Sequence, residues 1–317
     1  MNIFVAGATG VIGRRLVPGL VVAGHRVRAV SRGPDNRAAL LRMGATPVFV
    51  DLFDRAGVQR AVAGHEVVIN LATHIPASSV RMLLPGAWRQ NDRIRKLASA
   101  NLADAAMATG AARFIQESFA PVYHDGGDGW IDEEWPIEPV RYNRTVADAE
   151  ASAHRFADRG GAGVVLRFAA FYGPDAYQSR DMINLVRRGW IPLPGPADAF
   201  FSSISHDDAA AAVVAALDVP AGTYNVVDNE PLTRREHANV LAAALGVPPP
   251  RPLPPWIPAL MGSLGRLMSR SLRISNHKLC HHGAWTPAHP SMRDGWHSLA
   301  DTLDGESATR PATQAPQ

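Results

Sequence analysis

Short apolar runs alternate with longer amphipathic stretches over most of this chain. Short apolar runs bounded by polar residues or glycine are typical of buried strands, whereas apolar positions that recur every three or four residues are typical of helices. The pattern predicts strands over 2–6, 27–30, 46–50, 66–71, 113–116, 163–168, 200–204 and 223–227. It predicts helices over 11–23, 35–43, 55–63, 88–109, 142–158, 233–245 and 259–269, and one that begins at 207–208.

Three glycines stand between the first predicted strand and the helix after it, with the spacing G-x-x-G-x-x-G. Gly7 allows a tight turn off the strand, Gly10 has no side chain to obstruct a pyrophosphate, and Gly13 lets the helix lie close to the strand. The helix N-terminus then offers N–H groups and a partial positive charge to phosphates. The stretch predicts a dinucleotide site made by Gly7, Thr9, Gly10, Val11, Ile12 and Gly13.

The alternation of strands and helices predicts an α/β fold: a doubly wound parallel Rossmann-type sheet with a smaller C-terminal substrate lobe. We expect residues 1–172 to form the NAD(P)-binding domain, with 205–228 returning to it. Residues 173–303 would form mainly the substrate-binding lobe. The polar segment 304–317 contains two prolines and predicts a disordered tail.

Ligands of such sheets bind at the carboxyl ends of the strands. After the glycines, three further groups stand at such ends: Ser31 with Arg32, Asp51 with Leu52, and the run Leu71, Ala72 and Thr73. At the end of the second strand an acidic residue suits the ribose of NAD, whereas arginine suits the 2′-phosphate of NADP. Ser31 and Arg32 occupy that place, so we expect NADP rather than NAD.

The chain resembles the short-chain dehydrogenase/reductase superfamily in its extended branch of NAD(P)-dependent epimerases, dehydratases and reductases. Beyond the glycines, the resemblance rests on Asn70-Leu71-Ala72, on the stretch Leu166 to Pro174, on Asp207-Asp208-Ala209-Ala210, on Tyr224 to Thr233, and on motifs between Ser275 and Trp296. It implies an active site formed by a serine or threonine, a tyrosine, and a lysine four residues after the tyrosine.

Tyr142 matches the family's catalytic tyrosine, which would exchange a proton with a carbinol oxygen. Ser118 is the candidate hydroxyl, although the family register would favour Phe119. The lysine position holds Val146, which has neither charge nor donor. Because a lysine lowers the pKa of the tyrosine, its absence leaves three accounts open.

In the first account Tyr142 still acts, assisted by another cation such as Arg95 or Arg167. In the second, different residues do the chemistry, for example Tyr123, His74 or Glu117. In the third, the protein binds the nucleotide without turnover.

The glycine turn, Arg32 and the family resemblance together favour an NADP-dependent oxidoreductase of the extended or atypical short-chain type. It would act on a hydroxyl or carbonyl group of a small molecule. One alternative is an NAD-dependent nucleotide-sugar epimerase or dehydratase, for which Arg180, Arg187 and Arg188 are the available diphosphate ligands. Another is a non-catalytic NADP-binding regulator.

Composition and charge limit the kinds of binding partner that we expect for this chain. The formal net charge is +3 without a run of like charges, so we expect no nucleic-acid partner. The longest apolar run, 209–217, is far shorter than the ~20 residues of a membrane helix, and we expect no membrane partner. A single cysteine and a start without a signal-peptide pattern predict a cytoplasmic protein. We expect no bound metal. The resemblance implies a homodimer that forms through helices 88–109 and 142–158.

Overall fold

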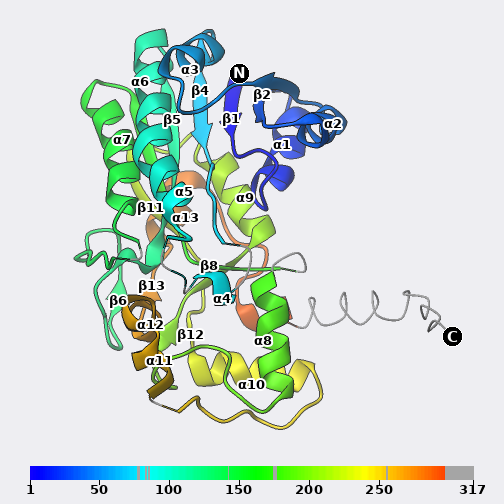
Figure 1. Cartoon of the computed structure of the whole chain (residues 1–317), viewed down its shortest axis with the longest axis vertical. Coiled ribbons are helices and arrows are strands. Elements are labelled where there is room, and N and C mark those ends of the chain that lie inside the picture. Colours follow the sequence, from blue (N-terminus) through cyan, green and yellow to red (C-terminus); the bar gives the residue numbers. More distant parts are fainter. Residues whose placement is uncertain are drawn as a thin grey trace, which may run out of the picture.

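The computed structural model describes residues 1–76, 79–82, 84, 86–141, 143–173, 177–254 and 256–296. Within these residues, seven parallel strands form the main sheet in the order β11-β7-β5-β4-β1-β2-β3 (Figure 1). They are β1 (Asn2–Ala6), β2 (Arg26–Ser31), β3 (Thr46–Phe49), β4 (Val67–Asn70), β5 (Arg113–Phe119), β7 (Ala162–Phe168) and β11 (Gly222–Val226). The order reverses between β1 and β4, which confirms the predicted doubly wound sheet.

Both faces of the sheet are apolar, because each strand sends alternate side chains to opposite sides. In β1, Ile3 and Val5 join one core with α1 (Gly13–Val22), α2 (Pro34–Arg42), α9 (His206–Ala215) and α13 (His277–Gly283). Phe4 and Ala6 join the other core with α3 (Arg55–Val62), α6 (Ser99–Thr109) and α7 (Val146–Asp158). The continuous apolar strand is thus explained by burial on both sides.

A smaller lobe lies beyond the carboxyl edge of the sheet (Figure 1). Its helices are α8 (Tyr177–Arg187), α10 (Arg234–Ala244), α11 (Trp256–Leu260) and α12 (Gly262–Ser269). Short strands pair as β8 (Ala170–Tyr172) with β10 (Ser203–Ser205), β9 (Phe200–Phe201) with β12 (Leu232–Thr233), and β6 (Trp130–Ile131) with β13 (Arg273–Ile274). Part of this lobe has its own core, formed around Ile183, Leu241 and Trp296.

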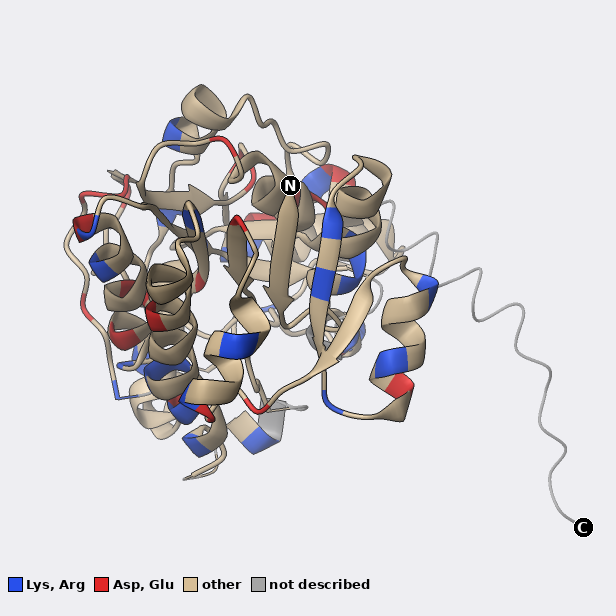
Figure 2. Ribbon diagram, turned by 90° about the horizontal axis from the view of Figure 1, so that it is seen from above, with Lys and Arg blue, Asp and Glu red and all other residues tan. Residues whose placement is uncertain are grey.

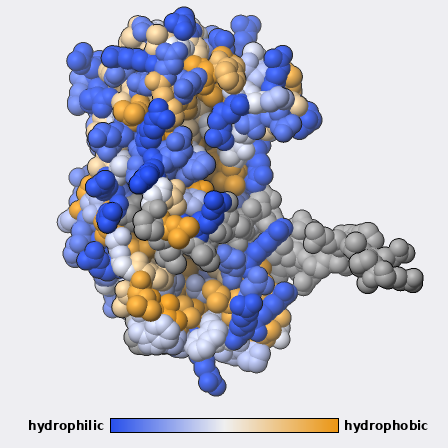
Figure 3. Space-filling model, viewed as in Figure 1, coloured by the Kyte–Doolittle hydropathy of each residue, from blue (hydrophilic) through white to orange (hydrophobic). Residues whose placement is uncertain are grey.

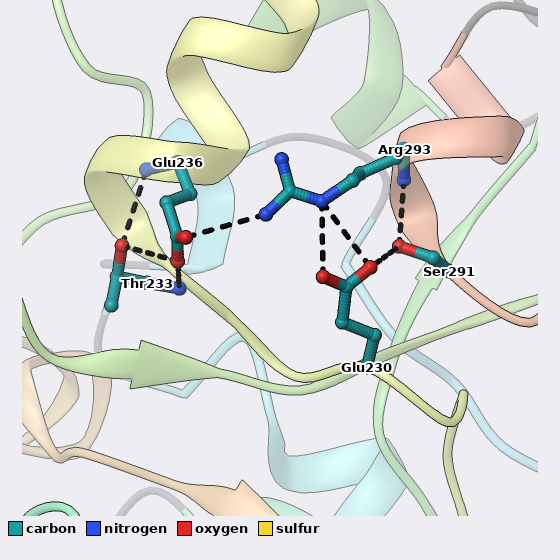
Figure 4. Close-up of polar contacts among 5 residues, drawn as sticks. All are labelled: Glu230, Thr233, Glu236, Ser291 and Arg293. Carbon is teal, nitrogen blue, oxygen red and sulfur yellow. Dashed lines mark hydrogen bonds and ion pairs between the residues drawn. The ribbon is translucent and has the colours of Figure 1, made fainter.

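Helix α10 begins with a capping box at Thr233. The Thr233 hydroxyl accepts a hydrogen bond from the backbone N–H of Glu236, whose carboxylate accepts one from the backbone N–H of Thr233. Figure 4 shows that Glu236 also faces Arg293, which in turn binds Glu230. These contacts hold the start of α10, and with it Arg234, the first residue of the helix.

Several predicted boundaries are wrong. The stretch 88–109 forms α5 (Arg89–Arg93), a π-helical turn (Ile94–Ala98) and α6 in succession. Strand β5 continues to Phe119 instead of ending at Gln116, because pairing with β7 persists to Phe168. The predicted helix 259–269 is divided before α12, where Gly262 has φ +58°.

Two further helices begin later than predicted, and their starts matter for the site. Helix α1 begins at Gly13, since residues 7–12 form the glycine turn. Helix α7 begins at Val146 instead of residue 142, after turns in which Asn143 accepts from the N–H of Val140. Segments α4 (Ser79–Met82) and a 3-10 turn (Ala120–Val122) complete the described elements.

The surface shows mixed charge and one notable apolar area. Figure 2 shows lysine and arginine spread over helices, loops and strands and interspersed with acidic residues. Apolar residues gather over the smaller lobe around α11 and α12 (Figure 3), where Trp256 and Leu260 are exposed. No helix in the described ranges is long and apolar enough to cross a membrane. The predicted tail, 304–317, lies outside the described residues.

Candidate active site

The glycine turn has the geometry that a bound pyrophosphate needs. Gly7 has φ +83°, and a Cβ there would collide with the backbone carbonyl of Leu71. A Cβ at Gly13 would collide with the carbonyl oxygen of Gly7, so the close approach of helix and turn requires glycine at both positions. Helix α1 begins after Ile12 without a side-chain cap, and the N–H groups of Arg14 and Arg15 donate to the carbonyls of Gly10 and Ile12. The partial positive charge at this helix start would favour an anion.

The other residues of the turn differ in what they expose. Gly10 is exposed and its N–H donates to the carbonyl of Gly7 at 3.0 Å, while Thr9 and Val11 are half-buried. Ile12 packs in the core, so it can offer a dinucleotide only its backbone. The turn fits the phosphate role that the sequence assigns to it.

The remaining predicted cofactor residues lie at the carboxyl ends of β2, β3 and β4. Ser31 is buried and its hydroxyl donates to the carbonyl of Gly33 at 3.0 Å, whereas Arg32 is exposed. The Asp51 carboxylate accepts from the N–H of Phe53 at 2.9 Å. Half-buried Leu52 follows it, and buried Leu71, with half-buried Ala72 and Thr73, continues past β4. Their assignment to the cofactor stays a prediction.

A cavity of about 220 Å³ lies between the carboxyl ends of β5 and β7 and the smaller lobe. Its walls are mostly aliphatic, aromatic and methionine side chains, contributed from both the sheet and helices α8 and α12. The charged or hydroxyl-bearing residues in the wall are Arg95, Glu117, Ser118, Ser202, Arg234 and Arg270. Such a cavity, apolar with a few convergent polar groups, is typical of a small-molecule site.

Ser118 belongs to a buried hydrogen-bond network. Its hydroxyl donates to Glu150 Oε1 at 2.5 Å, and Arg167 donates to both carboxylate oxygens of Glu150 at 2.8 and 2.7 Å. Arg167 also donates to the Tyr123 hydroxyl, which donates to Asn225 Oδ1 at 2.7 Å. Burial raises the pKa of Tyr123 to about 12. Tyr123 does not line the cavity, so the network positions Ser118 and does not bring Tyr123 to a substrate.

Glu117 and Arg95 form a second, looser pair in the cavity wall. Arg95 Nη2 lies 3.8 Å from Glu117 Oε1, which is an ion-pair distance without a hydrogen bond. Within the part of the chain that the structure describes, Glu117 Oε2 and Arg95 Nε have no hydrogen-bond partner. Burial raises the pKa of the Glu117 carboxyl, against the opposing effect of Arg95.

The predicted catalytic tyrosine, Tyr142, lies outside the described residues. The nearby positions provide no cation to the cavity: Val146 is fully buried at the start of α7, and Arg144 is exposed. Thr145 donates to Asp92 at 2.8 Å. His74, a second alternative, is exposed and is absent from the cavity wall.

Arg234 is the polar group that sequence reasoning missed. Its side chain is only 1% exposed, it lines the cavity, and within the described residues no carboxylate lies at ion-pair distance. Its Nη atoms donate to the carbonyls of Ala199, Met268 and Arg270, and Nε has no partner. Burial lowers its pKa to about 10. Nothing in the local sequence distinguishes it from its exposed neighbour Arg235.

Glu150 was also missed, although a signal existed. It lies four residues after Val146, and residues four apart share a helix face. An acidic residue one turn beyond the lysine position therefore points to the same interior as that position.

The chain belongs to the NAD-dependent epimerase/dehydratase family, whose model matches residues 3–227. This is the branch that the sequence resembles, so that prediction is confirmed. A 3-diazoavenalumate denitrifying reductase of a Streptomyces species is 35% identical over 312 residues, which cover 93% of this chain and 99% of the relative.

A 2-alkyl-3-oxoalkanoate reductase of Stenotrophomonas maltophilia is 30% identical over 265 residues, which cover 78% of this chain and 77% of the relative. The solved structure of a human epimerase family protein with NADPH has a TM-score of 0.78 at 21% identity, and the match covers 96% of this chain and 100% of that one. The last likeness shows the fold.

Proposed function

We propose that the chain is an NADPH-dependent reductase that acts on the carbonyl group of a hydrophobic small molecule. The observation that carries this proposal is the apolar cavity next to the predicted dinucleotide groove. Leu71, Ala72 and Thr73 belong to the groove, and Ile75 of the same segment lines the cavity. When bound there, the nicotinamide supplies hydride to the substrate.

The chain's residues divide the remaining work. The Gly7–Gly13 turn and the start of α1 hold the pyrophosphate, and exposed Arg32 pairs with the 2′-phosphate. Ser118, at the end of β5, lies beside the reacting group and can accept a hydrogen bond from the alcohol product. The family resemblance gives proton transfer to Tyr142, and Val146 in place of the family lysine leaves that role open to another acid.

The size and charge of the cavity suggest the kind of substrate. An apolar cavity of about 150 Å³ holds one benzene molecule, so a volume of about 220 Å³ suits a ring with a short side chain. Arg234 is a buried cation with no carboxylate of the described residues at ion-pair distance, and buried charges are normally paired. A carboxylate on the substrate would provide that partner. The names of both curated relatives denote carboxylates.

A second candidate is the reductive removal of nitrogen from a diazo compound. In that reaction hydride from NADPH forms a C–H bond, the C–N bond breaks, and N₂ leaves an arenediazonium ion. No proton has to reach an oxygen atom. Val146 in place of the family lysine favours this candidate, and the Streptomyces relative is named for such a reaction.

Nucleotide sugars fit the cavity poorly. Arg187 and Arg188 are exposed and do not line it, and Arg180 is likewise exposed and outside its wall. A diphosphate would therefore meet a mostly apolar surface. The proposed cytoplasmic location and the homodimer rest on the sequence alone.

The experiment is an assay of NADPH and NADH oxidation by the purified chain with benzoylacetate, benzenediazonium and UDP-glucose as probes. Oxidation of NADPH with benzoylacetate supports the first candidate, and release of N₂ with benzenediazonium supports the second. Tight NADPH binding without turnover of any probe would favour the non-catalytic regulator. Sugar epimerisation with retained NAD would overturn the proposal.

A further inference from the structure

Carbonyl reduction needs a proton donor near the substrate oxygen, and Ser118 is poorly suited to that role. A hydroxyl has one hydrogen, and Ser118 donates it to Glu150. Glu150 also accepts two hydrogen bonds from Arg167, so the network keeps the Ser118 hydrogen directed away from the cavity. Ser118 can accept a hydrogen bond from a ligand while this arrangement persists.

Glu117 is the neighbouring group with an unused oxygen. It precedes Ser118 on β5, lines the same cavity and is only 7% exposed. Its Oε2 has no hydrogen-bond partner among the described residues, although buried polar atoms are nearly always paired. An unpaired oxygen in the wall of a ligand-sized cavity points to a contact that a ligand completes.

Arg95 supplies the positive charge beside this carboxyl. It stands in the π-helical turn Ile94–Ala98, a geometry that is frequent at functional sites. It is 5% exposed, lines the cavity, and makes no hydrogen bond to any described residue. The other candidate cation, Arg167, is already bound to Glu150.

We infer that Glu117 donates the proton to the substrate oxygen and that Arg95 is the counter-ion of the carboxylate that remains. The inference rests on the proposed carbonyl reduction. Hydride from NADPH forms the new C–H bond, the carbonyl π electrons form an O–H bond with the proton of Glu117, and the products are an alcohol, NADP⁺ and ionised Glu117. Solvent returns the proton to Glu117 between turnovers.

The charges around Glu117 agree with this role. Burial raises the pKa of its carboxyl most strongly, Arg95 from the π-helical turn lowers it, and Glu150 from α7 raises it. Glu117 thus keeps its proton at a higher pH than an ordinary carboxyl. Arg95 favours the ionised product once the proton has left.

The test compares Glu117→Gln with Glu133→Gln, using NADPH and benzoylacetate across a pH series. Glu133 is a partly buried carboxyl with a raised pKa whose Oε1 accepts from the backbone of Asn225 outside the cavity. We expect Glu117→Gln to lower kcat by about 10²–10⁴-fold, the usual contribution of a positioned acid. NADPH affinity should stay unchanged, and Glu133→Gln should retain kcat.

The pH profile separates proton donation from a structural role. In the wild type, kcat/KM should fall as pH rises through the pKa of Glu117, and Glu117→Asp should retain such a fall. In Arg95→Gln the fall should move to higher pH, because removal of the cation raises the pKa of the acid. This readout remains if Glu117→Gln fails to fold.

An unchanged pH profile in Arg95→Gln, or a Glu117→Gln variant that keeps wild-type kcat, would overturn the inference and leave the proposed function standing. A wild type that binds NADPH and reduces no ketone would overturn both.

Discussion

Removal of the Glu150 charge should destabilise the fold more than any other single change at the site. In Glu150→Gln the buried guanidinium of Arg167 loses its ion-pair partner, at present 2.7 Å away. Breaking a buried pair from one side costs about 3–5 kcal/mol, because an uncompensated charge stays buried. Glutamine keeps one carbonyl oxygen as an acceptor, so we expect the lower end, about 3 kcal/mol.

The assay is urea unfolding followed by circular dichroism and, in parallel, thermal unfolding. A loss of about 3 kcal/mol corresponds to a fall in Tm of roughly 4–5 °C, since 317 residues give an unfolding entropy of about 0.7 kcal/mol/K. The double variant Glu150→Leu with Arg167→Met removes both charges and leaves apolar side chains in their place. It should be more stable than Glu150→Gln, because replacing a whole buried pair is often neutral.

A Glu150→Gln variant within about 1 kcal/mol of the wild type would show that the pair contributes no more than an ordinary surface pair, contrary to this prediction. A double variant as unstable as the single one would also refute it, because the cost would then come from packing and not from the unpaired charge.

Three further predictions concern the cofactor, the substrate and pH. Arg32→Asp should shift the NADPH/NADH affinity ratio at least tenfold (about 1.4 kcal/mol) toward NADH in a titration; an unchanged ratio would contradict the assignment of the 2′-phosphate. Arg234→Gln should raise the KM for benzoylacetate about tenfold or more, as expected for a charged hydrogen bond, and should leave the KM for its methyl ester unchanged. The control is Arg235→Gln, at an exposed arginine. An equal effect on the KM of acid and ester would contradict the anion site. Burial lowers the pKa of His237 from 6.5 to about 3, so its protonation favours the unfolded chain. The unfolding free energy should be fully retained above pH 6.5 and should fall as the pH drops toward about 3. In His237→Gln this free energy should fall less steeply over the same pH range.

Local sequence rules correctly predict the elements whose conformation depends only on residues close together in the chain. The glycine turn is such a case, because a turn with φ +83° at Gly7 excludes other side chains whatever surrounds it. Thr233 and Glu236 are another, since a capping box needs only residues three apart. The boundaries failed where pairing between distant segments decides them, as at β5, which continues to Phe119 because β7 pairs with it.

The candidate site follows the same division. The sequence indicated the cofactor groove and raised Ser118, Glu117 and Arg95 among other candidates, but it could not rank them. The ranking depends on the partners of each side chain: Arg167 binds Glu150, whereas Arg95 faces one charged partner among the described residues, Glu117 at 3.8 Å. Tyr142 stays a prediction.

Periodicity and short contiguous motifs were sufficient to indicate the doubly wound sheet and the family, and they predict where a dinucleotide binds. Which charged groups face the cavity follows from the tertiary structure alone. Arg95, Glu117 and Arg234 come from segments far apart in the sequence, and burial separates Arg234 from its exposed neighbour Arg235. A charge acquires its chemical role from the distances and burial that folding imposes, and neither is written in a local pattern.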